Sequence, residues 1–137
     1  TKSDIPGAPN EISMYVQEGY RCEPVRLSRY VIRLDGFFSW RCGYKPGELV
    51  TKPLVFEGDR LSINFSTSAL GYLRIRLLGA DGSPIEGYDS GRLFGDSVAR
   101  NVDFDRPLAA LAGKEICMQL EMSDADLYSF RFEKNCF

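Results

Sequence analysis

The fold is indicated most strongly by two neighbouring stretches, RLSINFST at residues 60–67 and GYLRIRLLG at residues 71–79. Both alternate between apolar and polar residues, and this period of two is typical of a β-strand with one buried face. Similar short runs, separated by turn residues, follow one another along nearly the whole chain, without the spacing of strand–helix–strand units. The sequence therefore predicts an all-β protein, a two-sheet antiparallel β-sandwich of jelly-roll type with about eight or nine strands.

The clearest turn signal is Asp35-Gly36, which lies between two β-rich runs in RYVIRLDGFFSWRC at residues 29–42. Asp-Gly suits the type I′ turn of a β-hairpin, because both central residues of that turn need a positive φ. We therefore expect a hairpin that pairs Val31 with Trp40 across its two strands.

Other stretches give further expectations. Pro53 has no N–H to donate to a ladder, so the run at residues 48–56 is expected at a sheet edge or bulged. Residues 80–96 indicate a loop-rich stretch, followed by a weakly alternating strand at residues 97–105. Two closing strands are expected around residues 123–126. The apolar faces of these two strands match only if the loop between them is longer than four residues or if the strands belong to opposite sheets.

The chain's 137 residues have the size of one ordinary domain, which we place over residues 1–137 with residues 1–25 as a junction leading into it. Basic and acidic residues nearly balance, at 17 and 19, so no strong field would attract nucleic acid or an acidic membrane. Histidine is absent, which removes the commonest general base and metal ligand. These features predict a binding or supporting domain rather than an enzyme, with neither nucleic acid nor a membrane among its partners.

Four cysteines leave the compartment open. Cys22, Cys42, Cys117 and Cys136 form no CxxC motif, so neither a zinc knuckle nor a redox pair is indicated. They permit disulfides in more than one connectivity, or buried thiols, because cysteine packs as a small hydrophobic residue. Buried thiols would suit an intracellular protein and disulfides an extracellular one. Of these two, the extracellular location is favoured.

Aspartates cluster at Asp103 and Asp105, and again at Asp124 and Asp126. Carboxylates of this kind can hold structural calcium, but neither cluster matches a calcium-loop signature, and local turns explain both. Nothing in the sequence selects a catalytic pair of acids either. We therefore expect no cofactor, with structural calcium as the alternative, and we name no catalytic residue.

Several long motifs resemble one kind of domain: RYVIRLDGFFSWR at 29–41, TKPLVFEGDRLSINFSTSALGYLRIRL at 51–77 and DADLYSFRF at 124–132. Taken together, they resemble the C-terminal β-sandwich that follows a propeller-shaped glycoside-hydrolase-like domain in many bacterial proteins, and residues 8–30 resemble the junction. The resemblance implies a carbohydrate-binding or accessory module attached to a catalytic domain, without a residue-level site. WRCGYK at residues 40–45 departs from this pattern, where less aromatic residues are usual.

Carbohydrate binding needs flat aromatic faces for sugar C–H groups and polar groups that reach the hydroxyls. The aromatic candidates near loops are Trp40, Tyr44, Tyr88 and Phe94. The candidates on a sheet face are Asn64, Tyr72, Arg74 and Arg76, extended by Gln119, Glu121 and Arg131. Trp40 also fits a core position, and the polar residues also fit an ordinary solvated face. Arg74 and Arg76 are expected to project together and to suit the carboxylate of an acidic sugar.

We therefore predict a non-catalytic carbohydrate-binding module that targets an attached polysaccharide-degrading enzyme to its glycan. The alternative is a structural accessory domain that packs against the propeller domain and has no ligand of its own; Phe37, Trp40 and Tyr44 would then be interface residues. A groove with exposed aromatic side chains favours binding, whereas a flat apolar patch favours docking. An independent hydrolase or lyase would have to rely on carboxylate, tyrosine or arginine chemistry.

Overall fold

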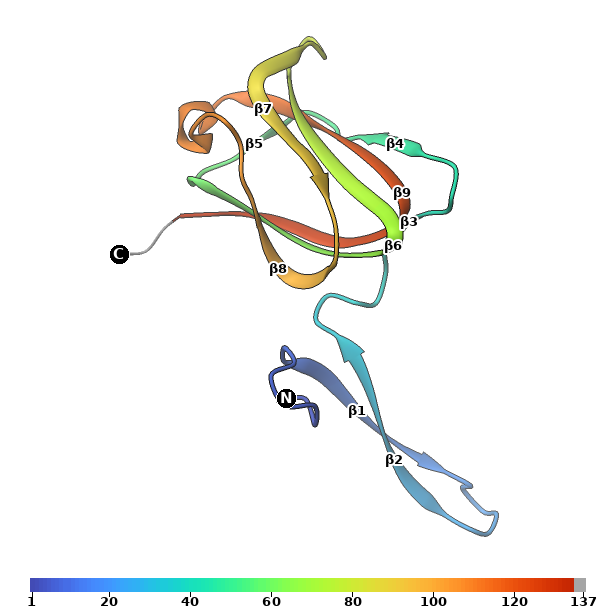
Figure 1. Ribbon diagram of the computed structural model, residues 1–137. Coiled ribbons are helices and arrows are strands. Elements are labelled where there is room, and N and C mark those ends of the chain that lie inside the picture. The colour runs from blue at the N-terminus through green and yellow to red at the C-terminus, as the bar shows by residue number, and fades with distance from the viewer. Residues whose placement is uncertain (135–137) are drawn as a thin grey trace. The chain divides into compact units, whose positions relative to one another are not determined.

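The computed structural model describes residues 1–134, and the chain divides into two compact units, Thr1–Phe38 and Ser39–Phe137 (Figure 1). The sequence places a single domain over the whole chain with a junction at residues 1–25. The division instead falls after Phe38, because the first unit has a sheet of its own. The described residues contain no α-helix, and no helix among them is long and apolar enough to cross a membrane.

The first unit is a two-stranded antiparallel sheet of β1 (Glu11–Glu18) and β2 (Arg26–Arg33). The strands pair along their whole length, from Glu11 with Arg33 to Glu18 with Arg26. Residues 1–25, expected to be a junction, thus contain β1, which is one of the two strands of this ladder.

The hairpin predicted at Asp35-Gly36 does not form, although a turn does. Asp35 has a positive φ of 55°, and the Gly36 N–H donates to the carbonyl oxygen three residues earlier at 3.0 Å. Val31, however, pairs with a residue of β1, and Trp40 pairs with Leu127 near the end of the chain. The prediction was wrong because pairing with distant strands outweighs a turn signal that acts only locally.

The second unit contains one seven-stranded antiparallel sheet. Its strands are β3 (Trp40–Cys42), β4 (Gly47–Val50), β5 (Leu54–Val55), β6 (Arg60–Gly79), β7 (Pro84–Leu93), β8 (Asp96–Val102) and β9 (Glu115–Glu133). A single 3-10 turn, η1 (Leu108–Leu111), lies between β8 and β9. The predicted all-β, antiparallel architecture is confirmed.

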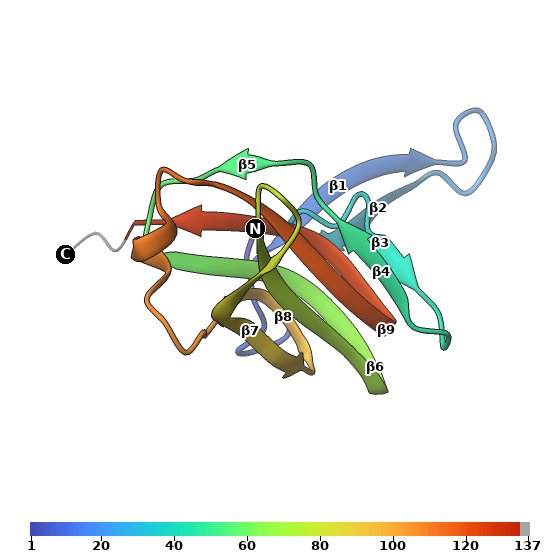
Figure 2. The same cartoon turned by 90° about the horizontal axis from the view of Figure 1, so that it is seen from above.

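The long strands β6 and β9 organise this sheet. They pair along their whole length, with register shifts between Asn64 and Phe65 and between Thr67 and Tyr72 of β6. The sequence predicts each of them as two strands with a break, but each is one strand that bends. The bend separates two arms: β8 and β3 flank the first arm, and β7, β4 and β5 flank the second. Figure 2 shows the doubled course of both strands, which gives a sandwich-like arrangement.

A close backbone approach lies at the centre of the bend. A Cβ atom on Gly71 would lie 2.2 Å from the Asp124 carbonyl oxygen and 2.7 Å from that of Ser123, so only glycine fits there. Asp124 itself takes a φ of 43°, a left-handed conformation that interrupts the extended course of β9. The loop predicted at residues 123–126 is therefore a bend, and the two halves of β9 belong to opposite arms.

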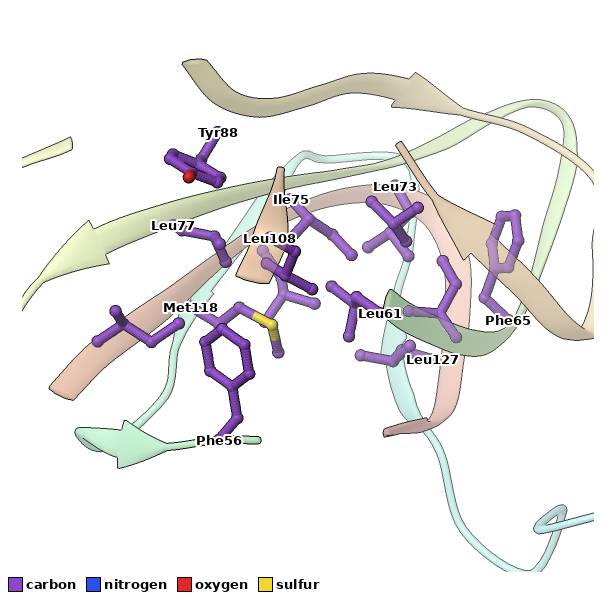
Figure 3. Packing of buried hydrophobic residues seen from close by; sticks show 14 of the residues in the cluster. Phe56, Leu61, Phe65, Leu73, Ile75, Leu77, Tyr88, Leu108, Met118 and Leu127 are labelled. Atoms are coloured by element: carbon purple, nitrogen blue, oxygen red, sulfur yellow. The ribbon is translucent and has the colours of Figure 1, made fainter. Parts of the chain in front are cut away.

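The inward faces of the two arms form the core (Figure 3). Its most deeply buried side chains include Leu61, Ile63, Phe65, Leu73, Ile75, Leu77, Met118 and Leu120. A bulge in β9 keeps the apolar residues on this face. Ser129 pairs with Asn64, whereas Leu127 pairs with the next residue of β6, so Tyr128 is the extra residue. The extra residue shifts the alternation by one and places both Leu127 and Phe130 on the inward side.

The two irregular regions differ in outcome. Pro53 interrupts the run at residues 48–56 as predicted, because β4 ends and β5 begins on either side of it and both pair with β9 at the edge of the sheet. Residues 80–96, predicted to be a loop, instead contain the whole of β7. Register shifts between β7 and β6 accommodate Gly87 and Gly91, which both have positive φ.

We expect Gly71→Ala to lower the free energy of unfolding by about 1–3 kcal/mol, because the added methyl group has to push the backbones of β6 and β9 apart. Gly43→Ala is the matched control, since no atom lies within 4 Å of its added Cβ, and it should change stability by less than about 0.5 kcal/mol. Urea unfolding followed by far-UV circular dichroism measures both. Equal midpoints for the two variants would contradict a bend that depends on this approach.

Candidate functional site

A groove of about 580 Å³ opens on the side of the edge strands β3 and β4. Its lining is mostly apolar and consists of Trp40, Leu49, Val50, Thr51, Lys52, Leu120, Leu127, Tyr128, Ser129 and Phe130. These residues come from β3, from the end of β4 and the segment after it, and from both halves of β9. Because β3 pairs with the first arm and β4 with the second, the groove lies where the two edge strands part.

Trp40 forms a wall of this groove. Its cross-strand partner Leu127 is a buried core residue, and directly paired residues of neighbouring strands share a face. The indole therefore lies on the inward side of the first arm. Because β3 is short and lies at the edge, 62% of Trp40 stays exposed. The sequence leaves Trp40 open between core and surface, and the structure places it on an exposed wall.

The floor of the groove is continuous with the core. Leu120 is fully buried beneath it, whereas Val50 and Phe130 are 47% and 38% exposed. Polar atoms are few, and some are already engaged: the Thr51 hydroxyl accepts the Met118 N–H at 2.9 Å. The groove therefore offers a wide apolar surface with a small number of polar groups around it, which is the usual composition of a small-molecule site.

Two further aromatic residues predicted to join Trp40 lie elsewhere. Tyr44 is 82% exposed in the turn between β3 and β4, where its carbonyl oxygen accepts a hydrogen bond from the Ser123 hydroxyl at 3.1 Å. Phe94 is exposed in the turn between β7 and β8. Neither is among the residues that line the groove, so the predicted group of aromatic residues does not form one platform.

Arg74 and Arg76 project together from the outer face of the second arm, as expected, but their charges are already matched. Arg74 donates from Nε and Nη2 to the two carboxylate oxygens of Asp89, at 2.9 and 2.5 Å. Arg76 donates from Nε to the same carboxylate at 3.2 Å, and its Nη2 lies 3.6 Å from a Glu121 carboxylate oxygen. The hydrogen bond from Arg74 lowers the pKa of Asp89 to about 2, although partial burial acts in the opposite direction. These guanidinium groups therefore offer little free charge to an acidic sugar.

The other three predicted ligand residues are buried. The Arg92 guanidinium lies over the Tyr72 ring, with its Cζ 4.2 Å from the ring centroid. The Tyr72 hydroxyl donates to the Glu121 carboxylate at 2.6 Å. Tyr88 belongs to β7 rather than to a loop, and its hydroxyl donates to the Pro107 carbonyl oxygen at 2.9 Å. Asn64 is 2% exposed in the middle of β6. None of the three presents a free surface to a glycan, because packing and internal hydrogen bonds already use them.

Sequence reasoning missed Val50, Lys52 and Phe130 as residues of the groove. The break at Pro53 was the available signal, because an interrupted edge strand leaves the neighbouring core partly uncovered. Phe130 has the pattern of an ordinary core residue, and the short edge strand leaves it 38% exposed.

The described cysteines are all free thiols: Cys22 is exposed, Cys42 is half-buried and Cys117 is buried. Cys136 lies outside the described residues, so its pairing stays open. Within residues 1–134, no group of three or more histidine, cysteine, aspartate or glutamate side chains comes together to hold a metal ion.

Comparisons with known proteins identify no relative. The chain matches no family model, no curated protein and no solved structure. The resemblance carried by the sequence motifs therefore stays an interpretation of the sequence.

The pairing of Asp89 with Arg74 makes stability depend on pH. Because the pKa of Asp89 falls from its ordinary value of 3.8 to about 2 in the folded chain, the stabilisation is complete above 3.8 and is lost as the pH falls through about 2. Asp89→Asn should therefore lower the free energy of unfolding at neutral pH, by at most about 1 kcal/mol, since the side chain is 40% exposed.

Urea unfolding at several pH values checks this expectation. The difference between the wild-type chain and Asp89→Asn should shrink below about pH 4 and vanish near pH 2. Glu86→Gln, which changes an exposed acid of the same strand, is the control and should show no such trend. A difference that stays constant over the whole pH range would contradict the assignment.

Proposed function

We propose that the second unit is a carbohydrate-binding module without catalytic activity. The observation that carries the proposal is Trp40, a 62% exposed tryptophan on the wall of a groove of about 580 Å³. A flat indole face among apolar side chains suits the C–H faces of a sugar ring, and the few polar groups suit its hydroxyls. A groove with an exposed aromatic wall favours ligand binding over flat docking.

In this proposal the module holds an attached polysaccharide-degrading enzyme close to its glycan and so raises the enzyme's effective concentration there. Catalysis belongs to the attached domain, and the module contributes binding without a cofactor. The motif resemblance supports a sandwich of jelly-roll type and a bacterial glycoside hydrolase as the attached enzyme.

A binding screen against immobilised plant, algal and host polysaccharides tests the proposal with the whole chain. We expect saturable binding to at least one glycan, and Trp40→Ala should weaken it by at least about tenfold because the stacking surface is lost. Tyr44→Ala is the matched control, since it removes an even more exposed aromatic ring outside the groove, and it should change affinity by less than about twofold. Far-UV circular dichroism confirms that each variant is folded.

Two results of the screen would speak against the groove. Binding lost in Tyr44→Ala but kept in Trp40→Ala would move the site to the turn between β3 and β4. No saturable binding to any glycan would reject the module altogether.

The first unit favours a second function, a structural accessory role. Within Thr1–Phe38, all of which the structure describes, no residue is buried. Ile12 pairs with Ile32, and Met14 pairs with Tyr30, so these side chains share one face of the hairpin with Val16. This face is apolar, and Met14 is 59% and Tyr30 49% exposed.

The opposite face of the hairpin is covered only in part, because Tyr15, Leu27 and Val31 on that face stay exposed. Arg29 donates to Asp4 and to Glu11, both at 2.7 Å, and the hydroxyls of Thr1 and Ser13 lie 2.6 Å apart. The N-terminal segment therefore lies over the part of this face near Ser13 and Arg29 and leaves the face of Met14 and Tyr30 open. A two-stranded sheet is at best marginally stable on its own in water, so a partner on the open face would stabilise the hairpin. In this second reading that partner is the propeller domain of the parent enzyme.

Hydrogen exchange on the whole chain measures the stability of the hairpin without a partner, as the protection of its backbone amides against exchange. We expect the backbone amides of β1 and β2 to exchange at least about a hundredfold faster than those at the centre of β6 and β9, because no buried side chain secures the hairpin. Equal protection of the two sheets would show that the hairpin needs no partner and would remove the support for docking.

A further inference from the structure

The groove beside Trp40 carries one formal charge. Among the described residues that line the groove, Lys52 is the only one that is charged at neutral pH, and none carries a carboxylate. No carboxylate of residues 1–134 forms an ion pair with Lys52, whereas Lys134 is held by Glu57 at 2.6 Å. An exposed lysine without an ion-pair partner thus lines the same groove as the exposed side chain of Trp40.

The backbone that carries Lys52 is anchored. The N–H of the preceding Thr51 donates to the Met118 carbonyl oxygen at 2.9 Å, and its hydroxyl accepts the Met118 N–H at the same distance. Pro53, on the other side, fixes its own φ and restricts Lys52 to extended conformations. The lysine thus extends from a held segment at the margin of the groove, which Val50 also lines.

We propose that the groove selects a sugar ring with an anionic substituent, a carboxylate or a sulfate, which stacks on Trp40 and places its charge against Lys52. The inference rests on the proposed function and names its substrate class. It also moves the site for an acidic sugar away from Arg74 and Arg76, whose charges Asp89 and Glu121 already match. A lysine acts as a point charge, so its recognition does not require the planar geometry that a carboxylate offers to arginine.

Matched charged and uncharged ligands test the inference with the whole chain. The acidic set is oligogalacturonate, an alginate-type oligouronate and a sulfated galactan oligosaccharide. The uncharged set is the methyl esters of the first two and the desulfated form of the third. We expect at least one acidic ligand to bind at least about tenfold more tightly than its uncharged form, with a preference that falls as salt is added. Which acidic ligand binds tells whether the substituent is a carboxylate or a sulfate.

Variants then assign the charge preference to the groove. Lys52→Gln should reduce affinity for the acidic ligand by about tenfold, to the level of its uncharged form, and should leave the uncharged form within about twofold. Lys45→Gln is the matched control, because it removes the same charge from the exposed turn between β3 and β4, outside the groove. It should keep the full preference. Trp40→Ala should weaken both forms.

The outcomes separate this inference from the function on which it rests. If a glycan binds through Trp40 but its charged and uncharged forms bind equally, or if Lys52→Gln and Lys45→Gln behave alike, the anionic class is overturned and the module stands. If no glycan binds in either set or in the wider screen, both proposals fail.

Discussion

The pairing of β6 with β9 through a shared bend is the constraint that shapes the second unit. Gly71 lets one backbone approach the other at Asp124, and the two strands turn together. The sheet then folds over itself, so the inward face of one arm packs against that of the other. Without the bend, side chains such as Ile63 and Ile75 would lie on a single exposed sheet face, and the apolar burial that stabilises the domain would be lost.

The groove is a consequence of the same bend combined with short edge strands. β3 covers only three residues of the first arm, and β4 ends before Pro53 on the second, so neither edge closes over the core between them. Trp40 lies on the inward side of the sheet yet stays exposed because no further strand covers it. A complete edge would have made Trp40 an ordinary core residue.

Charge is distributed unevenly over the second unit. On the outer face of the second arm, Arg74 and Arg76 are held by acidic neighbours, and Tyr72 is enclosed by the same network. In the groove, most of the lining side chains around Lys52 are apolar, and none of the described lining residues carries a carboxylate. On the outer face Arg74 and Arg76 are thus matched by carboxylates, whereas no carboxylate among the described residues that line the groove matches Lys52. For this reason charge selection is assigned to the groove.

Local alternation and composition were enough to predict part of this protein. The period of two in residues 60–67 and 71–79 predicted strands, and Pro53 predicted the broken edge. The polar side chains of Ser62 and Asn64, expected on a solvated face, are buried instead. Three other features emerged only in the folded chain: Trp40 pairs with Leu127, β9 runs through its bend as one strand, and Tyr88 is buried. Alternation is a property of the pleated backbone and can be read from neighbouring residues. Pairing, bends and burial depend on residues far apart in the chain, whose contacts outweigh local turn preferences.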